Sequence, residues 1–139
     1  MWTRVEMPRG VLWHRSEGAV LESVAVGELD ESGTAVMTRE LERLWKQHGW
    51  CAAFHNWERS TGYTTRFRLD WMRWATSPAA RAARFSHFRL NNSPLLKMAV
   101  SVASIAFAPQ QFTVHETSAG YAAARLAHLK PPTPLPGDH

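Results

Sequence analysis

Cysteine and histidine are the residues of this chain that first suggest chemistry, and Cys51, His55 and Asn56 lie close together in the sequence. A thiol, an imidazole and an amide are the groups that a cysteine hydrolase uses for nucleophilic attack. The apolar stretch Trp50–Asn56, however, predicts a short buried strand. At the usual rise of a strand, Cys51 and His55 would be about 13 Å apart, too far for a nucleophile to bond to its base. We therefore interpret Cys51 as a small buried apolar residue.

The seven histidines offer a second route to chemistry, as metal ligands or as bases. They contain no pair at the i, i+4 spacing of a helical metal site. Four lie in predicted strands, from which some could converge across a sheet: His14, His55, His87 and His115. Of these, His87 could approach Cys51 from a neighbouring strand. Glu58 and Asp70 are the only acids between residues 43 and 115, which leaves little material for paired-carboxylate catalysis. The sequence therefore predicts a protein that is not an enzyme and has no cofactor or metal.

Composition bounds the class of protein. The chain has 139 residues, of which 45% are apolar and seven are tryptophan, enough for one domain with a substantial core. Its single cysteine excludes an internal disulfide and suits a reducing cytoplasm. The first residues include Arg4 and lack an apolar core region, which argues against a signal peptide. We expect a cytoplasmic protein without membrane insertion.

Strands dominate the first third of the chain. Alternating apolar residues predict a meander over Trp2–Met7, Val11–Arg15 and Ala19–Gly27. Helical spacing then predicts a helix that is capped by Asp30 or Ser32 and ends at residue 49. Residues 50–56 follow as a fourth strand.

The second half alternates between helix and strand. A helix from Thr61 or Thr64 to residue 76 is followed by a helical turn or loop over residues 79–83 and a strand over residues 84–90. Ser93 and Pro94 then open an almost uncharged helix over residues 95–108, which is too short to cross a bilayer and is therefore predicted to be buried. A strand over residues 111–115 and a helix from residue 117 to about residue 129 complete the order.

This order, β-β-β-α-β-α-β-α-β-α, predicts an α/β fold over residues 1–129. We expect a mixed, mainly parallel sheet with antiparallel strands at its N-terminal edge, covered by about four helices. Prolines predict that residues 130–139 form a disordered tail. The exposed edge of the N-terminal hairpins could pair with a second copy to give a homodimer.

Arginine is concentrated in one segment. Residues 59–90 contain seven arginines and one acid, Asp70, so this segment carries a charge of +6 in a chain of net charge +4. Such a segment is either a solvated face or a docking surface for an acidic partner, a phosphate or an anionic membrane. Because no nucleic-acid recognition motif accompanies the charge, we expect no nucleic acid.

Two short motifs suggest a family. Trp57 is followed by Thr61-Gly62-Tyr63, and residues 93–100 read Ser-Pro-Leu-Leu-Lys-Met-Ala-Val at the start of the long helix. Together with the element order, they resemble the SpoIIAA-like branch of the STAS/SEC14-like fold over roughly residues 3–128. The resemblance implies a non-enzymatic bacterial regulatory domain that binds a partner kinase or anti-sigma factor.

The resemblance also implies a switch, because such domains are phosphorylated on a serine at the start of a helix. The corresponding turn here is Arg59-Ser60-Thr61-Gly62, which would place Ser60, with Thr61 beside it, at the switch position. Arg59 stands where the family carries an acid. The simpler interpretation is that Ser60 or Thr61 caps the following helix.

Our leading hypothesis is reversible binding of a protein partner through the turn Trp57–Tyr63 and the arginine-rich helix. Arginine and tyrosine are residue types that dominate binding energy at interfaces. The predicted contact residues are Trp57, Arg59, Tyr63, Arg66, Arg68 and Arg73.

The alternative hypothesis is a carrier or sensor of a small apolar or lipid-like ligand, since other members of this broad fold group enclose such ligands beneath their helices. The predicted pocket is lined by Trp71, Trp74, Met98, Val102 and Phe107. The same side chains equally suit a filled core.

Overall fold

The protein is described by a computed structural model that covers residues 1–94, 96–97 and 112–136. Its strands are β1 (Thr3–Met7), β2 (Gly10–Glu17), β3 (Val20–Leu29), β4 (Cys51–Tyr63), β5 (Ala83–Leu90) and β6 (Phe112–His115). Its helices are α1 (Glu31–His48), α2 (Thr65–Trp74), α3 (Pro78–Arg81) and α5 (Ser118–Leu126).

The strands form one sheet in the order β1-β2-β3-β4-β5-β6 within the described residues. The first three strands pair antiparallel, and β3, β4, β5 and β6 pair parallel. This mixed sheet confirms the predicted fold class. It also accounts for the succession of elements, because parallel neighbours need a crossover whereas antiparallel strands are joined by tight turns.

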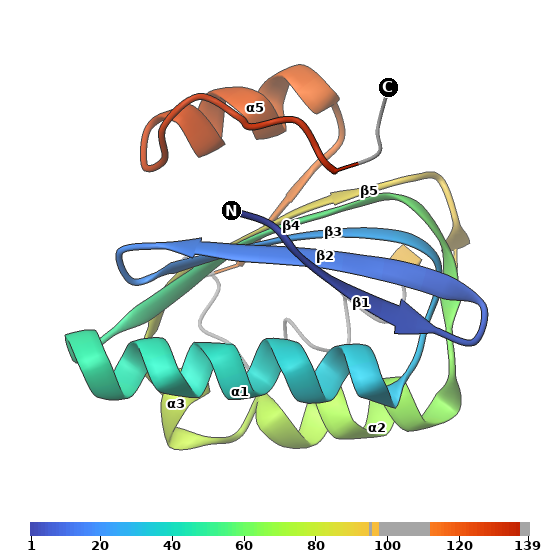
Figure 1. Cartoon of the computed structure of the whole chain (residues 1–139), viewed down its shortest axis with the longest axis horizontal. Helices are drawn as coiled ribbons and strands as arrows, with labels where there is room; N and C mark the ends of the chain where they lie inside the picture. The colour runs from blue at the N-terminus through green and yellow to red at the C-terminus, as the bar shows by residue number, and fades with distance from the viewer. Residues whose placement is uncertain (95, 98–111, 137–139) are drawn as a thin grey trace.

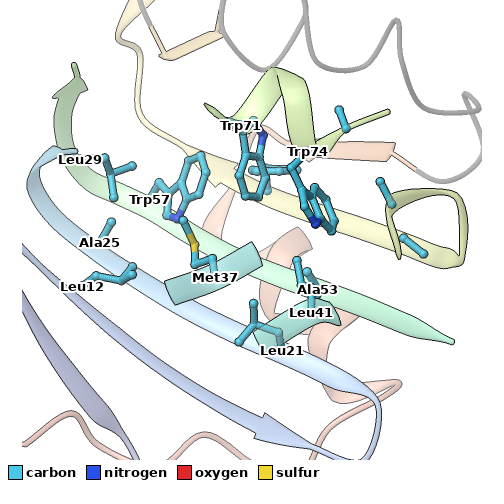
Figure 2. Close-up of a cluster of buried hydrophobic side chains, with 14 of the residues drawn as sticks. Leu12, Leu21, Ala25, Leu29, Met37, Leu41, Ala53, Trp57, Trp71 and Trp74 are labelled. Carbon is cyan, nitrogen blue, oxygen red and sulfur yellow. The ribbon is translucent and has the colours of Figure 1, made fainter. Parts of the chain in front are cut away.

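Helices cover both faces of the sheet. In Figure 1, α1, α2 and α3 lie below the sheet and α5 lies above it. The side chains of β4 alternate accordingly. Ala53 and Trp57 join the core between the sheet and helices α1 and α2, whereas Ala52 and Phe54 join a smaller core between the sheet and α5. Figure 2 shows the larger core, in which Met37 of α1 and Trp71 of α2 meet Trp57 of β4.

The first helix begins and ends where its sequence predicts. The Asp30 side chain accepts hydrogen bonds from the backbone N–H groups of Ser32 and Gly33 in the first turn of α1. Gly49 ends α1 with a φ of 80°, a left-handed conformation that glycine adopts without steric cost.

The main difference from the sequence-based expectation is the length of β4. The predicted strand ends at Asn56, but β4 continues as a ladder with β3 until Tyr63 pairs with Leu29. The ladder contains a β-bulge, since Trp57 and Glu58 together lie opposite the single residue Ala25. A bulge interrupts the alternation of apolar and polar residues, so the second half of β4 looks like a turn in the sequence.

The long apolar helix lies mostly outside the described residues, but its start is visible. Pro94, Leu96 and Lys97 are helical, and the Leu96 N–H donates to Ser93 Oγ at 3.5 Å, as the predicted cap requires. At the C-terminus, residues 130–136 are irregular, and the Trp2 indole N–H donates to the Thr133 carbonyl at 3.1 Å. The proline-rich segment therefore lies against the body of the domain.

Candidate functional site

The candidate site is the outer surface of α2 and the groove between α2 and α1. Thr64 caps α2, because its Oγ1 accepts the Phe67 N–H at 3.1 Å. The same hydroxyl lies 3.4 Å from Glu31 Oε2, which ties the first turn of α2 to the first turn of α1. The N-termini of both helices therefore lie together, beyond the carboxyl ends of β3 and β4.

The inner face of α2 is aromatic and fixes the helix to the sheet. Phe67, Trp71 and Trp74 are buried at helical spacing. The Trp71 ring lies 5.9 Å from the Trp57 ring in an edge-to-face contact and 5.5 Å from the Trp74 ring in a stacked one (Figure 2). Such ring pairs contribute about 0.5–1.5 kcal/mol each beyond their buried area. The outer side of α2 is therefore presented by a rigid support.

That outer side carries Arg66, Leu69 and Arg73, which we call the α2 face. Leu69 is 47% exposed, one of the few large apolar side chains of the described residues that remain in water. Arg66 Nε lies 3.0 Å from Asp70 Oδ1, whereas an Arg73 guanidinium nitrogen lies 4.0 Å from the same oxygen. The Arg73 side chain is 77% exposed, so its charge is the more available of the two to a partner.

A groove of about 410 Å³ adjoins the α2 face, and its walls come from both helices. Helix α1 contributes Thr34, Thr38 and Glu42, and helix α2 contributes Arg66 and Arg73, together with Asp70 and the edge of Trp74. The groove is lined by two acids, Glu42 and Asp70, and by two arginines, so its formal charges cancel. The buried Thr34 hydroxyl, on the α1 wall, has no hydrogen-bond partner in the described structure.

Three of the residues predicted to contact a partner lie elsewhere. Trp57 is 2% exposed and fills the core, so the prediction that it contacts a partner is wrong. Arg59 follows the bulge of β4 and lines a cavity on the α5 side of the sheet, away from the α2 face. Arg68 lies on the side of α2 away from the groove, in a small depression near Tyr63 and Leu96. Arg66 and Arg73 are thus the arginines of this set that the structure brings together.

Tyr63 ends β4 and packs against the core. Its ring lies 6.1 Å from that of Phe67, at the inner edge of α2. Tyr63 and Trp57 thus both pack against α2, and Tyr63 is the half-buried one of the two. The segment itself is part of a strand and not the turn that the sequence suggested.

The predicted switch position is also placed differently. Ser60 lies within β4 and is 1% exposed, and its hydroxyl donates to the carbonyls of Gly27 at 3.0 Å and Gly62 at 3.2 Å. Thr61 is exposed in the same strand. Neither residue caps a helix, because α2 begins four residues further on, after Thr64. The prediction that Ser60 stands at a helix N-terminus is therefore wrong.

The predicted ligand pocket is described in part. Trp71 and Trp74 belong to the filled core beneath α1 and α2, and the space beside Trp71 is about 10 Å³, the size of one water. Met98, Val102 and Phe107 lie outside the described residues.

The cysteine and the nearby histidine have separate structural partners. The Cys51 thiol donates to the Ala79 carbonyl at 3.4 Å, and burial raises the pKa of this thiol to about 11. His55 Nδ1 lies 2.6 Å from Ser23 Oγ, which also accepts the Trp57 indole N–H at 3.1 Å. Burial lowers the pKa of His55 to about 3, so the ring is neutral at pH 7. Thiol and imidazole both stabilise the core.

Two of the strand histidines converge, as their positions suggested. His87 Nδ1 lies 2.8 Å from His115 Nε2, and the rings stack at 5.0 Å beneath α5. Burial, with contributions from His115 and His128, lowers the pKa of His87 to about 4. Among the described residues, no group of three or more His, Cys, Asp or Glu side chains could hold a metal ion.

Sequence analysis missed a buried ion-pair network on the α5 side of the sheet. Glu22 of β3 accepts from Arg15 at 2.9 Å and, through its other oxygen, from the Arg125 Nε of α5. Arg125 also donates to the Lys130 carbonyl at 2.7 Å. A signal was present, because Glu22 interrupts the apolar run of β3 and Arg125 interrupts an alanine-rich helix.

No protein-family model matches this sequence, and no curated protein matches it either. Solved structures do match. An uncharacterized DUF3478-family protein from Shewanella loihica with a SpoIIAA-like fold is 17% identical, with a TM-score of 0.52 over 89% of this chain and 91% of that one. The anti-sigma factor antagonist SpoIIAA in its unphosphorylated form is 15% identical, with a TM-score of 0.52 over 93% and 100%.

A third solved structure is an anti-sigma factor antagonist from Mycobacterium paratuberculosis. It is 8% identical, with a TM-score of 0.50 over 89% of this chain and 93% of that one. The chain therefore has the STAS/SpoIIAA-like fold that its element order and motifs resembled. In the described part of the chain, no helix is both long and apolar enough to cross a membrane.

Proposed function

We propose that this protein is a non-enzymatic regulatory domain of the bacterial cytoplasm that binds a protein partner through the α2 face. The observation that carries the proposal is the exposed Leu69, flanked by Arg66 and Arg73 on a helix whose opposite side is anchored in the core. Two of the structurally similar proteins are anti-sigma factor antagonists. The proposal assumes that this chain, like an anti-sigma factor antagonist, acts by binding another protein.

The chemistry of the α2 face indicates what kind of partner fits. Leu69 offers apolar area at the centre, where burial contributes roughly 25 cal/mol per Å² removed from water. Arg73, which Asp70 holds at 4.0 Å, can pair with a carboxylate of the partner without losing a strong internal bond. The helix is already ordered, so binding costs little conformational entropy. We therefore expect a partner with an apolar pocket beside an acidic residue.

The proposal does not include phosphorylation of Ser60, because that hydroxyl is buried and bonded to two carbonyls. The exposed hydroxyl in the first turn of α2 belongs to Thr65. A phosphate at that place would face the free N–H groups of the helix. If partner binding is switched, Thr65 is the residue that we propose for the switch.

The first experiment identifies the partner by its position on the surface. A photo-crosslinking amino acid is placed at Leu69 and, as a matched control, at Leu126, a similarly exposed leucine on α5 at the opposite face of the sheet. In the native host we expect a discrete crosslinked product from position 69 and none from position 126. The same product from both positions, or from neither, would contradict the proposed surface.

The second experiment measures affinity for the partner so identified. We expect the double reversal Arg66→Glu/Arg73→Glu to weaken the Kd at least tenfold, about 1.4 kcal/mol. The control is Arg39→Glu/Lys46→Glu, which reverses two exposed cations at the same seven-residue spacing on α1, outside the groove. An equal effect of both double variants would show that net charge, and not the α2 face, determines binding.

A further inference from the structure

The free edge of the sheet is a feature that none of the preceding assignments uses. Strand β1 stands at one end of the strand order and pairs with β2 (Figure 1). Within the described residues, no strand pairs with its other side. Such an edge presents backbone N–H and C=O groups to which another strand can bond. The edge of β1 is therefore a candidate surface for strand addition.

The hairpin of β1 and β2 determines which backbone groups point outward. Met7 pairs with Gly10 across a two-residue loop, and the residues that flank such a loop bond to each other. Bonded pairs alternate along an antiparallel ladder, so Val5 also directs its backbone N–H and C=O toward β2. Arg4 and Glu6 occupy the alternate positions and direct their backbone groups away from the sheet.

The same two residues carry opposite charges that remain in water. The side chains of Arg4 and Glu6 are 55% and 69% exposed, and they form an ion pair with each other at 2.7 Å. The Arg4 guanidinium also lies 5.9 Å from the centre of the Trp13 ring. An exposed ion pair within one strand contributes little to stability, so its charges can pair with those of a second strand at little cost.

A second copy of β1 is the strand that this pattern fits. When two β1 strands pair antiparallel about a twofold axis at Val5, Arg4 of each copy lies opposite Glu6 of the other. Outward-facing backbone groups then meet each other, and each Arg4–Glu6 pair exchanges two N–H···O=C hydrogen bonds. The two Val5 side chains lie opposite each other at a non-bonded position, where side chains are closest.

Other registers of the same pairing are less favourable. A shift that places Arg4 opposite Arg4, or Glu6 opposite Glu6, sets like charges against each other. A shift by one residue places outward-facing backbone groups opposite inward-facing ones and loses the hydrogen bonds. Charge and backbone geometry therefore select the same register. Like charges along an edge strand would repel a second copy, but the charges of β1 alternate in sign.

We propose that this protein forms a homodimer in which the β1 edges of two copies pair antiparallel, with the twofold axis at Val5. The sheet then continues from one copy into the other. Because β1 has only 5 residues, the interface is small, and the dimer forms reversibly at micromolar to millimolar protein. The β1 edge shares no residue with the α2 face, so the dimer and the proposed function are tested independently.

Exchange of the two charges tests the dimer in the full chain. Sedimentation equilibrium gives the Kd of the unmodified protein, which should dimerise reversibly. Arg4→Glu leaves only acids at the paired positions and Glu6→Arg leaves only bases, so each variant alone should dimerise at least tenfold more weakly. An equimolar mixture of the two variants should form a heterodimer with an affinity close to that of the unmodified protein, because each acid then faces a base.

Two further variants separate the pairing of β1 from net charge. Arg4→Glu/Glu6→Arg restores opposite charges across the axis and should dimerise like the unmodified protein. Lys46→Glu, in the last turn of α1, changes the net charge as much as Arg4→Glu does and should leave the Kd unchanged. The proposal is overturned by a monomer at millimolar protein, by equal weakening in Lys46→Glu and Arg4→Glu, or by a mixture of the two β1 variants that does not associate.

Discussion

The neutral, buried imidazole of His55 makes the stability of this domain depend on pH in a way that can be calculated. In the folded chain burial lowers the pKa of His55 to about 3, whereas an unfolded chain holds histidine near its ordinary value of about 6.5. The folded state therefore binds fewer protons than the unfolded state at intermediate pH. The contribution of His55 to stability is fully present above pH 6.5 and is lost as the pH falls toward 3.

The size of the loss follows from these two pKa values. Proton linkage gives a decrease in the free energy of unfolding of about 1.4 kcal/mol at pH 5.5 and about 2.7 kcal/mol at pH 4.5, relative to pH 8. The value at pH 5.5 hardly changes if the folded pKa is 4 and not 3, because both lie well below that pH. His87, with its pKa lowered to about 4, adds a decrease of the same sign.

Urea denaturation followed by circular dichroism at pH 8, 5.5 and 4.5 tests this argument. His55→Gln keeps a side chain that can bond to Ser23 but does not titrate, so its acid destabilisation should be smaller than that of the unmodified protein by the amounts above. The reasoning is refuted if His55→Gln and the unmodified protein lose the same stability on acidification. If His55→Gln does not fold, His55→Leu/Ser23→Ala serves the same comparison.

Three substitutions test other parts of the structure by urea denaturation. Ser60→Asp should lower the free energy of unfolding by about 3 kcal/mol or more, because it buries a charge and removes the hydrogen bonds of the hydroxyl. Thr61→Asp in the same strand should lower it by less than about 1 kcal/mol. Similar losses in the two variants would contradict the burial of Ser60. Arg125→Met should cost about 3–5 kcal/mol by leaving Glu22 underpaired, and adding Glu22→Gln should recover part of it; an unchanged double variant would argue against the pair. Thr34→Val should stabilise by up to about 1 kcal/mol, since it replaces an unpartnered buried hydroxyl, and a loss of stability would indicate that this hydroxyl has a partner.

Most of the fold could be predicted from the sequence because local signals and tertiary packing agree. Asp30 and Gly49 mark the two ends of α1, and the alternation of Phe88 and Leu90 with polar neighbours marks β5 and its buried side. The change from hairpins to strand–helix units then determines where the sheet changes from antiparallel to parallel. These features depend on short stretches of the chain, so a sequence pattern can predict them.

The candidate site was harder to predict because two irregularities of the β3–β4 ladder govern it, the bulge at Trp57 and Glu58 and a second register shift between Gly27 and Glu28. The sequence does not reveal these irregularities, so the polar residues after Trp57 look like a turn that leads into a helix, and Ser60 looks like a cap. The structure instead continues β4, buries Trp57 against Trp71 and bonds Ser60 to Gly27 of the neighbouring strand. A hydrogen bond between residues 33 positions apart has no signature in either local segment.

The arginine-rich segment shows why a count of charges along a chain does not define a surface. Residues 59–90 pass through a strand, two helices and another strand, so consecutive arginines face different sides of the domain. Arg59 and Arg89 line the cavity beneath α5, Arg66 and Arg73 lie on the α2 face, and Arg84 lies over the Trp50 ring at 4.1 Å. The charge of +6 in sequence is therefore divided among separate environments. Any partner of the α2 face meets two of these arginines, together with Leu69, and the chemistry of that small set must account for its specificity.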